Sequence, residues 1–318
     1  MINITIIIPV YNRRNYIKKC LDALIVQDMD NVEIILVDDG STDGSQIICE
    51  NYSKKYSFIK VIHQSNLGVA VARNTGVRNA TGKWISWIDS DDIVGSNYIN
   101  SLKQFINLDF DVIVFGYQIF SNSIPFVKQD VKNEVKEISK DKVMQELSNI
   151  NFGNFLWNKL FKKELFMNIT FPSGKVYEDI ATTYRLLDKA TKIGVSTKKI
   201  YFYRQNAESI VHQHNSAQAI KLLEDRIDAQ SKLVDYLHSK YPLAVELQNH
   251  ELLVAMLEYI KEVEISNSSK NKMYGYCIRY IKSYNSSVKK DGIKIFGKVF
   301  LVNHFYRLYK SIINIHKG

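Results

Sequence analysis

The chain lacks the features that mark several common classes of protein. Only 4 prolines and 3 cysteines occur in its 318 residues, and Cys20, Cys49 and Cys277 lie far apart, outside any Cys-x-x-Cys pattern. An odd, scattered set of cysteines argues against disulfides and favours buried free thiols in a reducing cytosol. No stretch approaches the roughly 18 apolar residues of a membrane-spanning helix. The apolar run at residues 4–8 is too short for a signal peptide and has no basic leader, so we expect none.

Two familiar nucleotide-binding motifs are missing as well. The first predicted strand, residues 3–10, is not followed by Gly-x-Gly-x-x-Gly, and the chain has no Gly-x-x-x-x-Gly-Lys. These absences exclude a standard dinucleotide site and a P-loop. A phosphate-bearing ligand must therefore be held in another way.

What the sequence does contain is typical of a soluble globular protein with a basic end. The apolar fraction is 46% and the charged fraction is 24%. The net charge is +9, and residues 289–318 contribute most of it, with six lysines and Arg307 against Asp291. Such a basic end suggests an anionic partner, either a membrane surface or nucleic acid. No recognised nucleic-acid-binding module accompanies the charge, so we expect no nucleic acid.

The apolar pattern predicts an α/β fold followed by helices. Four short apolar runs alternate with helical patterns over residues 1–100, which predicts a Rossmann-like, mostly parallel sheet with helices on both faces. From Ala217 onward the apolar residues keep a helical period. We expect strands at residues 3–10, 33–37, 58–63, 84–88, 111–120, 193–195 and 200–203, with residues 124–137 irregular. We expect three parts, residues 1–100, residues 101–215 and a helical region at residues 216–318.

Three acids follow the fourth predicted strand. Asp89, Asp91 and Asp92 fall within four residues, together with Ser90. Clustered carboxylates repel one another unless a cation lies among them, and Mg²⁺ or Mn²⁺ carrying phosphates on its other side is the natural candidate. The alternative is a solvated acidic turn, since Asp and Ser are ordinary turn residues.

Other strand ends carry polar groups that would meet at the same edge of the sheet. The first strand ends in Pro9-Val10-Tyr11-Asn12 and the second in Asp38-Asp39. Open α/β sheets bind ligands at the carboxyl ends of their strands, and an aromatic ring beside carboxylates suits a nucleoside. Arg73, on the helix that Gly68 opens, suits a diphosphate. The alternatives are a turn that caps a helix for the acids and a surface position for Arg73.

Taken together, four segments resemble a known family. They are Ile-Ile-Ile-Pro-Val-Tyr-Asn (6–12), Val-Asp-Asp-Gly-Ser-Thr-Asp (37–43), Asn-Leu-Gly-Val-Ala-Val-Ala-Arg-Asn-Thr-Gly (66–76) and Asp-Ser-Asp-Asp (89–92). In this order they resemble the family-2 glycosyltransferases, which have the GT-A fold. The resemblance is strong over about residues 4–100 and continues more weakly to residue 209.

The resemblance implies an inverting transfer from a nucleotide-activated sugar, commonly a UDP-hexose or UDP-N-acetylhexosamine, with Mn²⁺ or Mg²⁺. Asp89 and Asp91 would be the two acids of the DxD motif and would contact the metal. His212 is a further candidate ligand, although a lone histidine is more often structural. The implied donor site comprises Pro9, Val10, Tyr11, Asn12, Asp38, Asp39, Arg73, Asp89, Ser90 and Asp91.

The acceptor side is implied by residues further along the chain. Inversion by a single displacement needs a base opposite the leaving diphosphate, and Asp179 is the predicted base, with Glu178 orienting the acceptor. The alternative is that both acids simply favour the first turn of a helix. Trp157 would stack on an acceptor sugar unless it is a core residue. Further acceptor contacts are predicted for Lys159, Asp92 and Arg204.

Apolar residues recur at helical spacing between Ile295 and Ile313, with basic residues elsewhere around the helix. This pattern predicts an amphipathic helix on anionic lipid. Packing on the preceding helices and a homodimer contact are the alternatives.

We therefore expect a cytoplasmic transferase, peripheral on the inner face of the cell membrane. Its acceptor would be a glycan or a lipid-linked sugar in bacterial capsule, exopolysaccharide or teichoic-acid synthesis. Processive synthases similar to this family carry a Gln-x-x-Arg-Trp motif, which is absent here, so we expect one sugar per acceptor. The rival hypotheses are a nucleotidyltransferase that makes a nucleotide-sugar and a non-catalytic nucleotide-sugar-binding subunit.

Overall fold

The computed structural model describes residues 1–121, 134–149, 152–205, 216–284, 288–304 and 306–315. The chain forms two compact units, Met1–Ala207 and Glu208–Gly318. Each unit has a hydrophobic core of its own, which is the physical mark of a separate folding unit.

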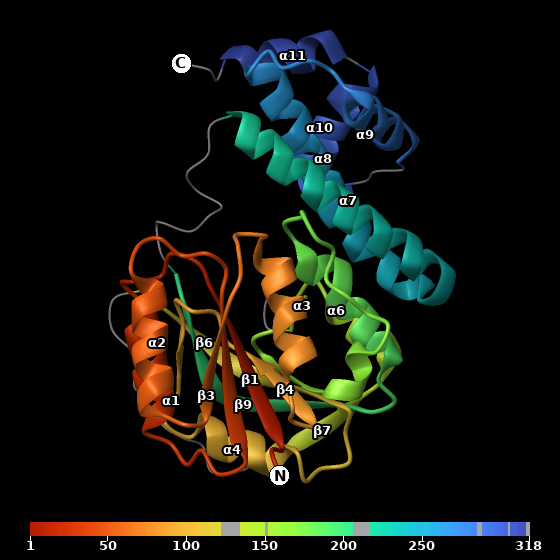
Figure 1. Cartoon of the computed structure of the whole chain (residues 1–318). Coiled ribbons are helices and arrows are strands. Elements are labelled where there is room, and N and C mark those ends of the chain that lie inside the picture. The colour runs from red at the N-terminus through yellow and green to blue at the C-terminus, as the bar shows by residue number, and fades with distance from the viewer. Residues whose placement is uncertain (122–133, 150–151, 206–215, 285–287, 305, 316–318) are drawn as a thin grey trace. The chain divides into compact units, whose positions relative to one another are not determined.

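A mixed sheet is the centre of the first unit. Its strands lie in the order β3-β2-β1-β4-β8-β6-β9-β5, and β7 pairs with β9 outside this path. The first four strands are β1 (Ile4–Val10), β2 (Val32–Asp38), β3 (Ile59–His63) and β4 (Trp84–Trp87). They run parallel, which confirms the predicted α/β fold for this half (Figure 1).

Helices cover both faces of the parallel strands because successive side chains of a strand point to opposite faces. The crossover helices are α1 (Ile17–Ile25), α2 (Ser45–Lys55) and α3 (Val69–Asn79). Ile8 of β1 shares a core cluster with Leu21 of α1 and Cys49 of α2. Ile7 faces α3 instead, and a Cβ at Gly76 would collide with the Ile7 side chain. Glycine at this position therefore lets α3 lie close against the sheet, on the face opposite α1 and α2.

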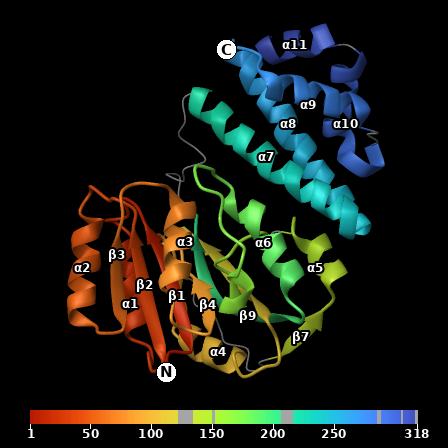
Figure 2. The ribbon, with the colours of Figure 1, turned by 45° about the vertical axis from the view of Figure 1, so that its right-hand side comes forward.

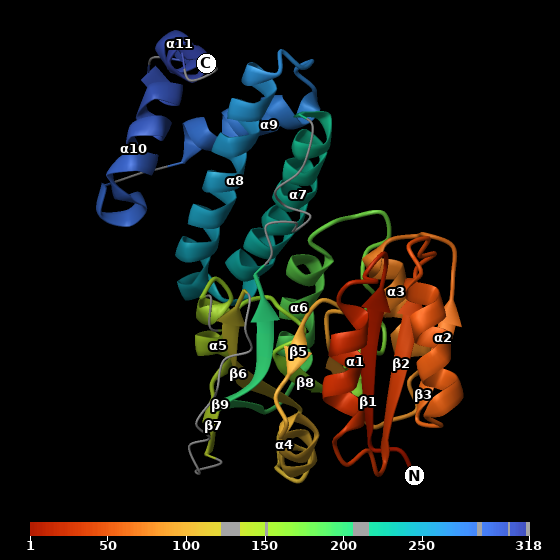
Figure 3. The same cartoon turned by 90° about the vertical axis from the view of Figure 1, so that its left-hand side faces the viewer.

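The second half of the sheet mixes strand directions. Its strands are β5 (Ile93–Val94), β6 (Val112–Phe120), β7 (Val135–Ile138), β8 (Lys159–Lys162) and β9 (Ile193–Arg204). β8 lies antiparallel between β4 and β6, and β6 runs parallel to β9 (Figure 3). The two short strands predicted between residues 193 and 203 are one strand, β9. The segment predicted to be irregular ends in β7, while its residues 124–133 lie outside the described residues.

Three α-helices support this half of the sheet. They are α4 (Tyr98–Phe105), α5 (Lys140–Glu146) and α6 (Glu178–Lys189), with a 3₁₀ helix at Lys163–Phe166. Ser139 caps α5 by accepting a hydrogen bond of 3.3 Å from the Lys142 N–H. Tyr177 has a φ of 64°, which turns the chain sharply into α6. α5 and α6 lie side by side (Figure 2).

The second unit is helical over its described residues. It comprises α7 (Ser216–Lys240), a 3₁₀ helix at Pro242–Ala244, α8 (Val245–Ile265), α9 (Lys272–Ser283), α10 (Val288–His304) and α11 (Tyr306–Ile315). α7 packs along α8 (Figure 3). The core between the helices also takes in Val299 and Val302 of α10 and Tyr309 and Ile313 of α11. Among the described residues, none of the helices combines the length and the apolar character that crossing a membrane requires.

Part of the C-terminal apolar stripe is thus buried in the core of the helical unit. The prediction that this stripe lies on lipid is wrong for its four buried side chains, because protein covers them. Packing on the preceding helices, the alternative reading, accounts for them. Phe300, Leu308 and Ile312 remain exposed.

Candidate active site

The three acids of the turn after β4 differ in their exposure to solvent. Asp92 is only 1% exposed. Its Oδ2 accepts a hydrogen bond of 2.6 Å from the Tyr201 hydroxyl, and its Oδ1 accepts one of 2.7 Å from the Arg204 N–H. Asp92 therefore fastens the end of β9 to the turn. The prediction that it contacts an acceptor is wrong, because its carboxylate is enclosed and already bonded.

Asp89 and Asp91 are the acids of this turn that can be reached. Their side chains are 34% and 31% exposed. Asp89 Oδ1 lies 3.5 Å from Arg73 Nη2, and Asp91 Oδ2 lies 3.5 Å from Arg13 Nε. Burial raises the pKa of Asp89 to about 6; the Arg73 charge opposes this shift and the Asp91 charge adds to it. Carboxylates gathered in one turn repel each other, which favours a cation at this turn.

The donor set fits a hard divalent ion that is bound together with a phosphate ligand. In the part of the chain that the structure describes, no group of three or more His, Cys, Asp or Glu side chains is arranged to hold a metal. Mg²⁺ usually takes one or two carboxylates and completes its shell with water and substrate phosphates. Asp89 and Asp91 would supply the carboxylates. His212, the predicted extra ligand, lies outside the described residues.

Asp39, at the end of β2, holds the loop that begins α3. Its Oδ1 accepts hydrogen bonds from Gln64 Nε2 at 2.7 Å and from the Leu67 N–H at 2.9 Å, and its Oδ2 accepts one from the Gly68 N–H at 2.8 Å. Gly68 has a φ of 89°, which glycine adopts readily. The sequence analysis missed this role, although the Asn-Leu-Gly turn after a strand-end acid was its signal. A contact between Asp39 and a nucleoside stays a prediction.

Asp38 is bound in a similar way. Its Oδ1 accepts a hydrogen bond of 3.1 Å from the Ser41 N–H, and its Oδ2 lies 2.8 Å from His63 Nδ1. The other ring nitrogen of His63 lies 2.7 Å from Glu50 Oε1. The hydrogen bonds to Glu50 and Asp38 raise the pKa of His63. His63, which sequence reasoning did not single out, thus positions Asp38 from the neighbouring strand.

The loop after β1 leaves one aromatic ring exposed. Asn12 has a φ of 51°, and its Oδ1 accepts a hydrogen bond of 2.9 Å from the Thr42 N–H. The Val10 carbonyl accepts one of 2.8 Å from the Asp39 N–H, so the ends of β1 and β2 are tied together. Tyr11, between these anchors, is 43% exposed. Its ring is available for stacking, whereas Pro9 pairs with Val37 inside the sheet.

Arg73 joins the acidic turn to α6. The arginine is 7% exposed, its Nη1 donates to Glu178 Oε1, and its Nη2 faces Asp89. Its guanidinium also lies 5.9 Å from the ring centroids of Trp87 and Phe171. Arg73 is therefore not a surface residue. It is a buried cation between the two predicted groups of functional acids.

Asp179 lies beside this ion pair, half-buried in the first turn of α6. Its Oδ1 accepts a hydrogen bond of 2.8 Å from the Ile180 N–H. Burial and the Glu178 charge raise the pKa of Asp179 to about 7, against the lowering effect of Arg73. A carboxylate with a pKa near neutrality is suited to general-base catalysis.

Lys159 and Trp157 belong to the interior, and their predicted acceptor contacts are wrong. Lys159 is fully buried, and its Nζ donates to the carbonyls of Phe152, Gly153 and Phe155 at 2.7 to 2.9 Å. Its donors are thus taken up by the chain itself. Trp157 is 5% exposed and stacks on aromatic neighbours, with centroid distances of 4.9, 4.7 and 5.4 Å to Phe155, Tyr201 and Tyr203.

Arg204 supports the acidic turn from β9. Its Nε donates a hydrogen bond of 2.7 Å to the Asp91 carbonyl. Its guanidinium lies 4.4 Å from the centroid of the Phe120 ring and 5.4 Å from that of Tyr16. The side chain is half-buried, so an acceptor contact stays a prediction.

The parallel half-sheet, with polar groups at the carboxyl ends of β1, β2 and β4, defines an α/β protein with the GT-A fold. A solved structure of TarS from S. aureus, residues 1–349 in complex with UDP-GlcNAc, has the same fold, with a TM-score of 0.62 and 20% identity. The match covers 99% of this chain and 89% of that chain. Within this fold class, the chain belongs to glycosyl transferase family 2, whose sequence profile matches residues 5–170.

Two curated bacterial relatives are similar in sequence. Glycosyltransferase GlyA of Streptococcus pneumoniae is 31% identical over 275 residues, which is 83% of this chain and 38% of the relative. The poly(ribitol-phosphate) beta-glucosyltransferase of Bacillus spizizenii is 36% identical over 209 residues, 63% of this chain and 32% of the relative. The chain thus spans about a third of the length of these two proteins.

Proposed function

We propose that the protein is an inverting glycosyltransferase that moves one sugar from a UDP-sugar to a hydroxyl group of a bacterial surface glycan. The observation that carries this proposal is the pair of acid groups on either side of Arg73. Asp89 and Asp91 follow β4, and Glu178 and Asp179 begin α6. The first group suits a leaving diphosphate with its metal, and the second suits an attacking hydroxyl.

On the donor side, the exposed ring of Tyr11 would stack on the uracil base. Asp89 and Asp91 would hold Mn²⁺ or Mg²⁺, which when bound acts as a Lewis acid on the departing diphosphate. The UDP-GlcNAc bound to TarS supports a UDP-sugar as the donor. The remaining residues of the proposed donor site are Pro9, Val10, Asn12, Asp38, Asp39, Arg73 and Ser90.

On the acceptor side, Asp179 would take the proton of the acceptor hydroxyl as its oxygen attacks the anomeric carbon. The attack comes from the face opposite the diphosphate, so the configuration inverts. Glu178 is held by Arg73 and orients the acceptor. The raised pKa of Asp179 leaves it able to accept a proton near neutral pH.

The acceptor would be a polymer of the bacterial surface, such as poly(ribitol phosphate). The Bacillus spizizenii relative, a poly(ribitol-phosphate) beta-glucosyltransferase, supports this class. Exposed Phe300, Leu308 and Ile312, in helices that also carry Lys298 and Arg307, would bring the protein to an anionic membrane. A Phe300→Asp/Leu308→Asp variant should then sediment less with vesicles containing phosphatidylglycerol; unchanged sedimentation contradicts membrane contact.

Asp179→Asn and Asp91→Asn test the two sides separately. Asp179→Asn should keep the affinity for UDP and lose transfer by about 10²- to 10⁴-fold, the usual contribution of a general base. Asp91→Asn should instead weaken UDP binding in the presence of Mn²⁺. Calorimetric titration of UDP with and without Mn²⁺, and UDP release from a panel of UDP-sugars with poly(ribitol phosphate), measure both effects.

Asp188→Asn, which changes an acid further along α6, is the control and should leave transfer unchanged. Transfer by Asp179→Asn at the wild-type rate removes this residue as the base. Equal UDP affinity with and without Mn²⁺ removes the metal from the proposal.

A further inference from the structure

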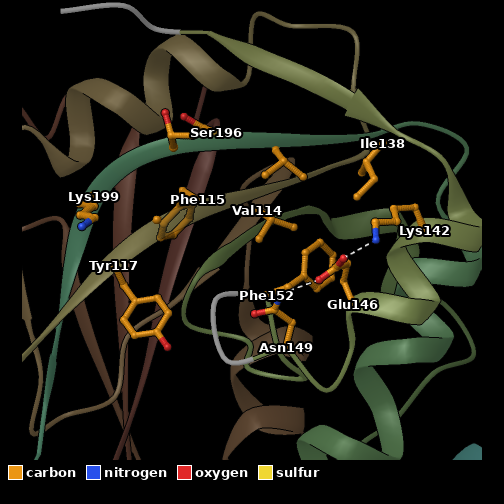
Figure 4. A pocket seen from close by; sticks show the side chains of 13 residues that line it. Val114, Phe115, Tyr117, Ile138, Lys142, Glu146, Asn149, Phe152, Ser196 and Lys199 are labelled. Carbon is orange, nitrogen blue, oxygen red and sulfur yellow. Dashed lines mark hydrogen bonds and ion pairs between the residues drawn. The ribbon is translucent and has the colours of Figure 1, made fainter. Parts of the chain in front are cut away.

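A cavity of about 370 Å³ lies in the second half of the sheet (Figure 4). It is lined by β6, β9, the end of β7, α5 and the residues that follow α5. None of the proposed donor-site residues, and neither Glu178 nor Asp179, lines it.

An irregularity in strand pairing opens this cavity. Val114 pairs with Val195 and Gly116 pairs with Lys199, so β6 has one residue between the pairs where β9 has three. The extra residues of β9 bulge away from the regular ladder. A Cβ at Gly116 would lie 2.9 Å from the Thr197 carbonyl oxygen, so this close approach requires glycine. Bulges of this kind often re-aim side chains beside functional sites.

The lining combines aromatic rings with one bonded polar cluster. Tyr117 and Phe152 supply the rings, whereas the ring of Phe115 packs into the core against Tyr98 and Phe105. Glu146 lies beside Phe152; one carboxylate oxygen is 2.6 Å from Lys142 Nζ and the other accepts a hydrogen bond of 2.6 Å from Asn149 Nδ2 (Figure 4). Aromatic rings together with a fixed carboxylate and amide are suited to a sugar, whose C–H faces are apolar and whose hydroxyls donate and accept.

Other ligand classes fit this lining less well. A wholly apolar ligand would remove water from Glu146 and Lys142 without replacing its hydrogen bonds, which is costly. A phosphate group would approach the Glu146 carboxylate and would find Lys142 already paired with it, which leaves Lys199 as its cation among the lining residues. The volume is at the small end of the range of ligand pockets, about 300–1,000 Å³, and so suits one sugar ring rather than a chain.

The wall of the cavity is bonded to the helix that carries Asp179. The Phe152 carbonyl accepts a hydrogen bond of 2.8 Å from Lys159 Nζ, and the same ammonium lies 5.1 Å from the centroid of the Phe152 ring. Two residues further on, the Asn154 carbonyl accepts a hydrogen bond of 2.7 Å from the Thr183 hydroxyl of α6. Thr183 is one helical turn beyond Asp179. An occupant of the cavity would therefore lie on the acceptor side.

We propose that this cavity is an accessory subsite for an uncharged sugar residue of the acceptor, separate from the residue that receives the transferred sugar. The inference rests on the proposed function, because it assumes a carbohydrate acceptor. Binding energy gained at a subsite away from the reacting hydroxyl can position this hydroxyl and thereby raise the transfer rate for longer acceptors.

Glu146→Ala and Ile138→Trp test the subsite, since the first removes its central acceptor and the second fills its space. Asp141→Ala is the matched control, an exposed acid on α5 that does not line the cavity. Saturation-transfer NMR and calorimetric titration would measure binding of methyl glucoside, cellobiose, maltose, lactose and chitobiose. We expect at least one of these sugars to bind, with affinity reduced at least tenfold in Glu146→Ala and Ile138→Trp and unchanged in Asp141→Ala.

Equal binding by all variants, or no binding of any sugar to the wild-type protein, overturns the proposal. Displacement of the bound sugar by inorganic phosphate would indicate an anion site and also overturns it. Asp179→Asn should keep this sugar binding, whereas the proposed function is judged by UDP-sugar turnover in the wild-type protein. The two proposals can therefore fail independently.

Discussion

Replacing Arg73 by methionine should destabilise the first unit strongly. The arginine is buried, bonded to Glu178 and close to Asp89. Removal of one partner from a buried ion pair costs about 3–5 kcal/mol, because the other charge is left without a counter-ion. Most of this cost should come from Glu178, whose side chain is 7% exposed, whereas the Asp89 side chain is 34% exposed and partly hydrated.

The cost converts into a large change in melting temperature. For a unit of about 200 residues, 1 kcal/mol corresponds to about 2–4 °C. Arg73→Met should therefore lower the Tm of the first unit by about 6–20 °C in calorimetry of the full chain. Arg78→Met, on the same helix, should change it far less, because the partner of this arginine is the neutral Thr75 hydroxyl, 2.8 Å away.

A double variant isolates the charge effect from the loss of packing. Arg73→Met combined with Glu178→Gln removes the uncompensated carboxylate, so it should be more stable than Arg73→Met alone by about 0.5–3 kcal/mol, the usual coupling between contacting residues. If the double variant is less stable than Arg73→Met, the buried Glu178 charge is not the source of the loss. A Tm within 2 °C of the wild type for Arg73→Met refutes the reasoning altogether.

Two further predictions concern Asp179 and Lys159. The Asp179 carboxyl must be deprotonated to act as a base, and its pKa is raised to about 7. The rate of transfer at saturating donor should therefore rise with pH through about 7 and level off above it. A rate that is constant from about pH 5.5 to 8.5 would contradict this assignment. Lys159→Met leaves three buried carbonyls without their donor, at a cost of about 1–3 kcal/mol each, and part of this cost is offset because an ammonium group no longer has to be buried. Urea unfolding should therefore show that the free energy of unfolding falls by more than about 2 kcal/mol. Lys199→Met, which changes an exposed lysine, is the control.

The first half of the fold could be predicted because its signals are local. Each of the first four strands is a short apolar run that ends in a polar turn, and each helix between them has its own apolar spacing. Parallel pairing then follows from the alternation of strands and helices. The antiparallel strand β8 could not be found this way, since it is inserted between β4 and β6 by pairing with segments that are distant in sequence.

In the candidate site, too, only the features with a local sequence signal could be predicted. That acids gather after β4 was readable from the sequence, but which of them face inward was not. Asp91 and Asp92 are adjacent and of the same type. Asp92 turns into the protein because Tyr201 and the Arg204 N–H, more than 100 residues away, supply its donors. Lys159 was misjudged for a related reason, because lysine is seldom buried and only the fold of residues 152–155 encloses its ammonium.

The choice of Asp179 as the base follows from how the two acid groups differ around Arg73. Burial raises the pKa of both Asp89 and Asp179, to about 6 and about 7. Asp89 has the guanidinium of Arg73 at 3.5 Å, which favours its ionised form, and it has Asp91 in the same turn, with which it would attract a cation. Asp179 makes no ion pair with the described residues, whereas Glu178 is paired with Nη1 of Arg73. The two acids therefore differ in their partners rather than in pKa. The proposed function therefore assigns charge stabilisation to the strand-end acids and proton transfer to Asp179.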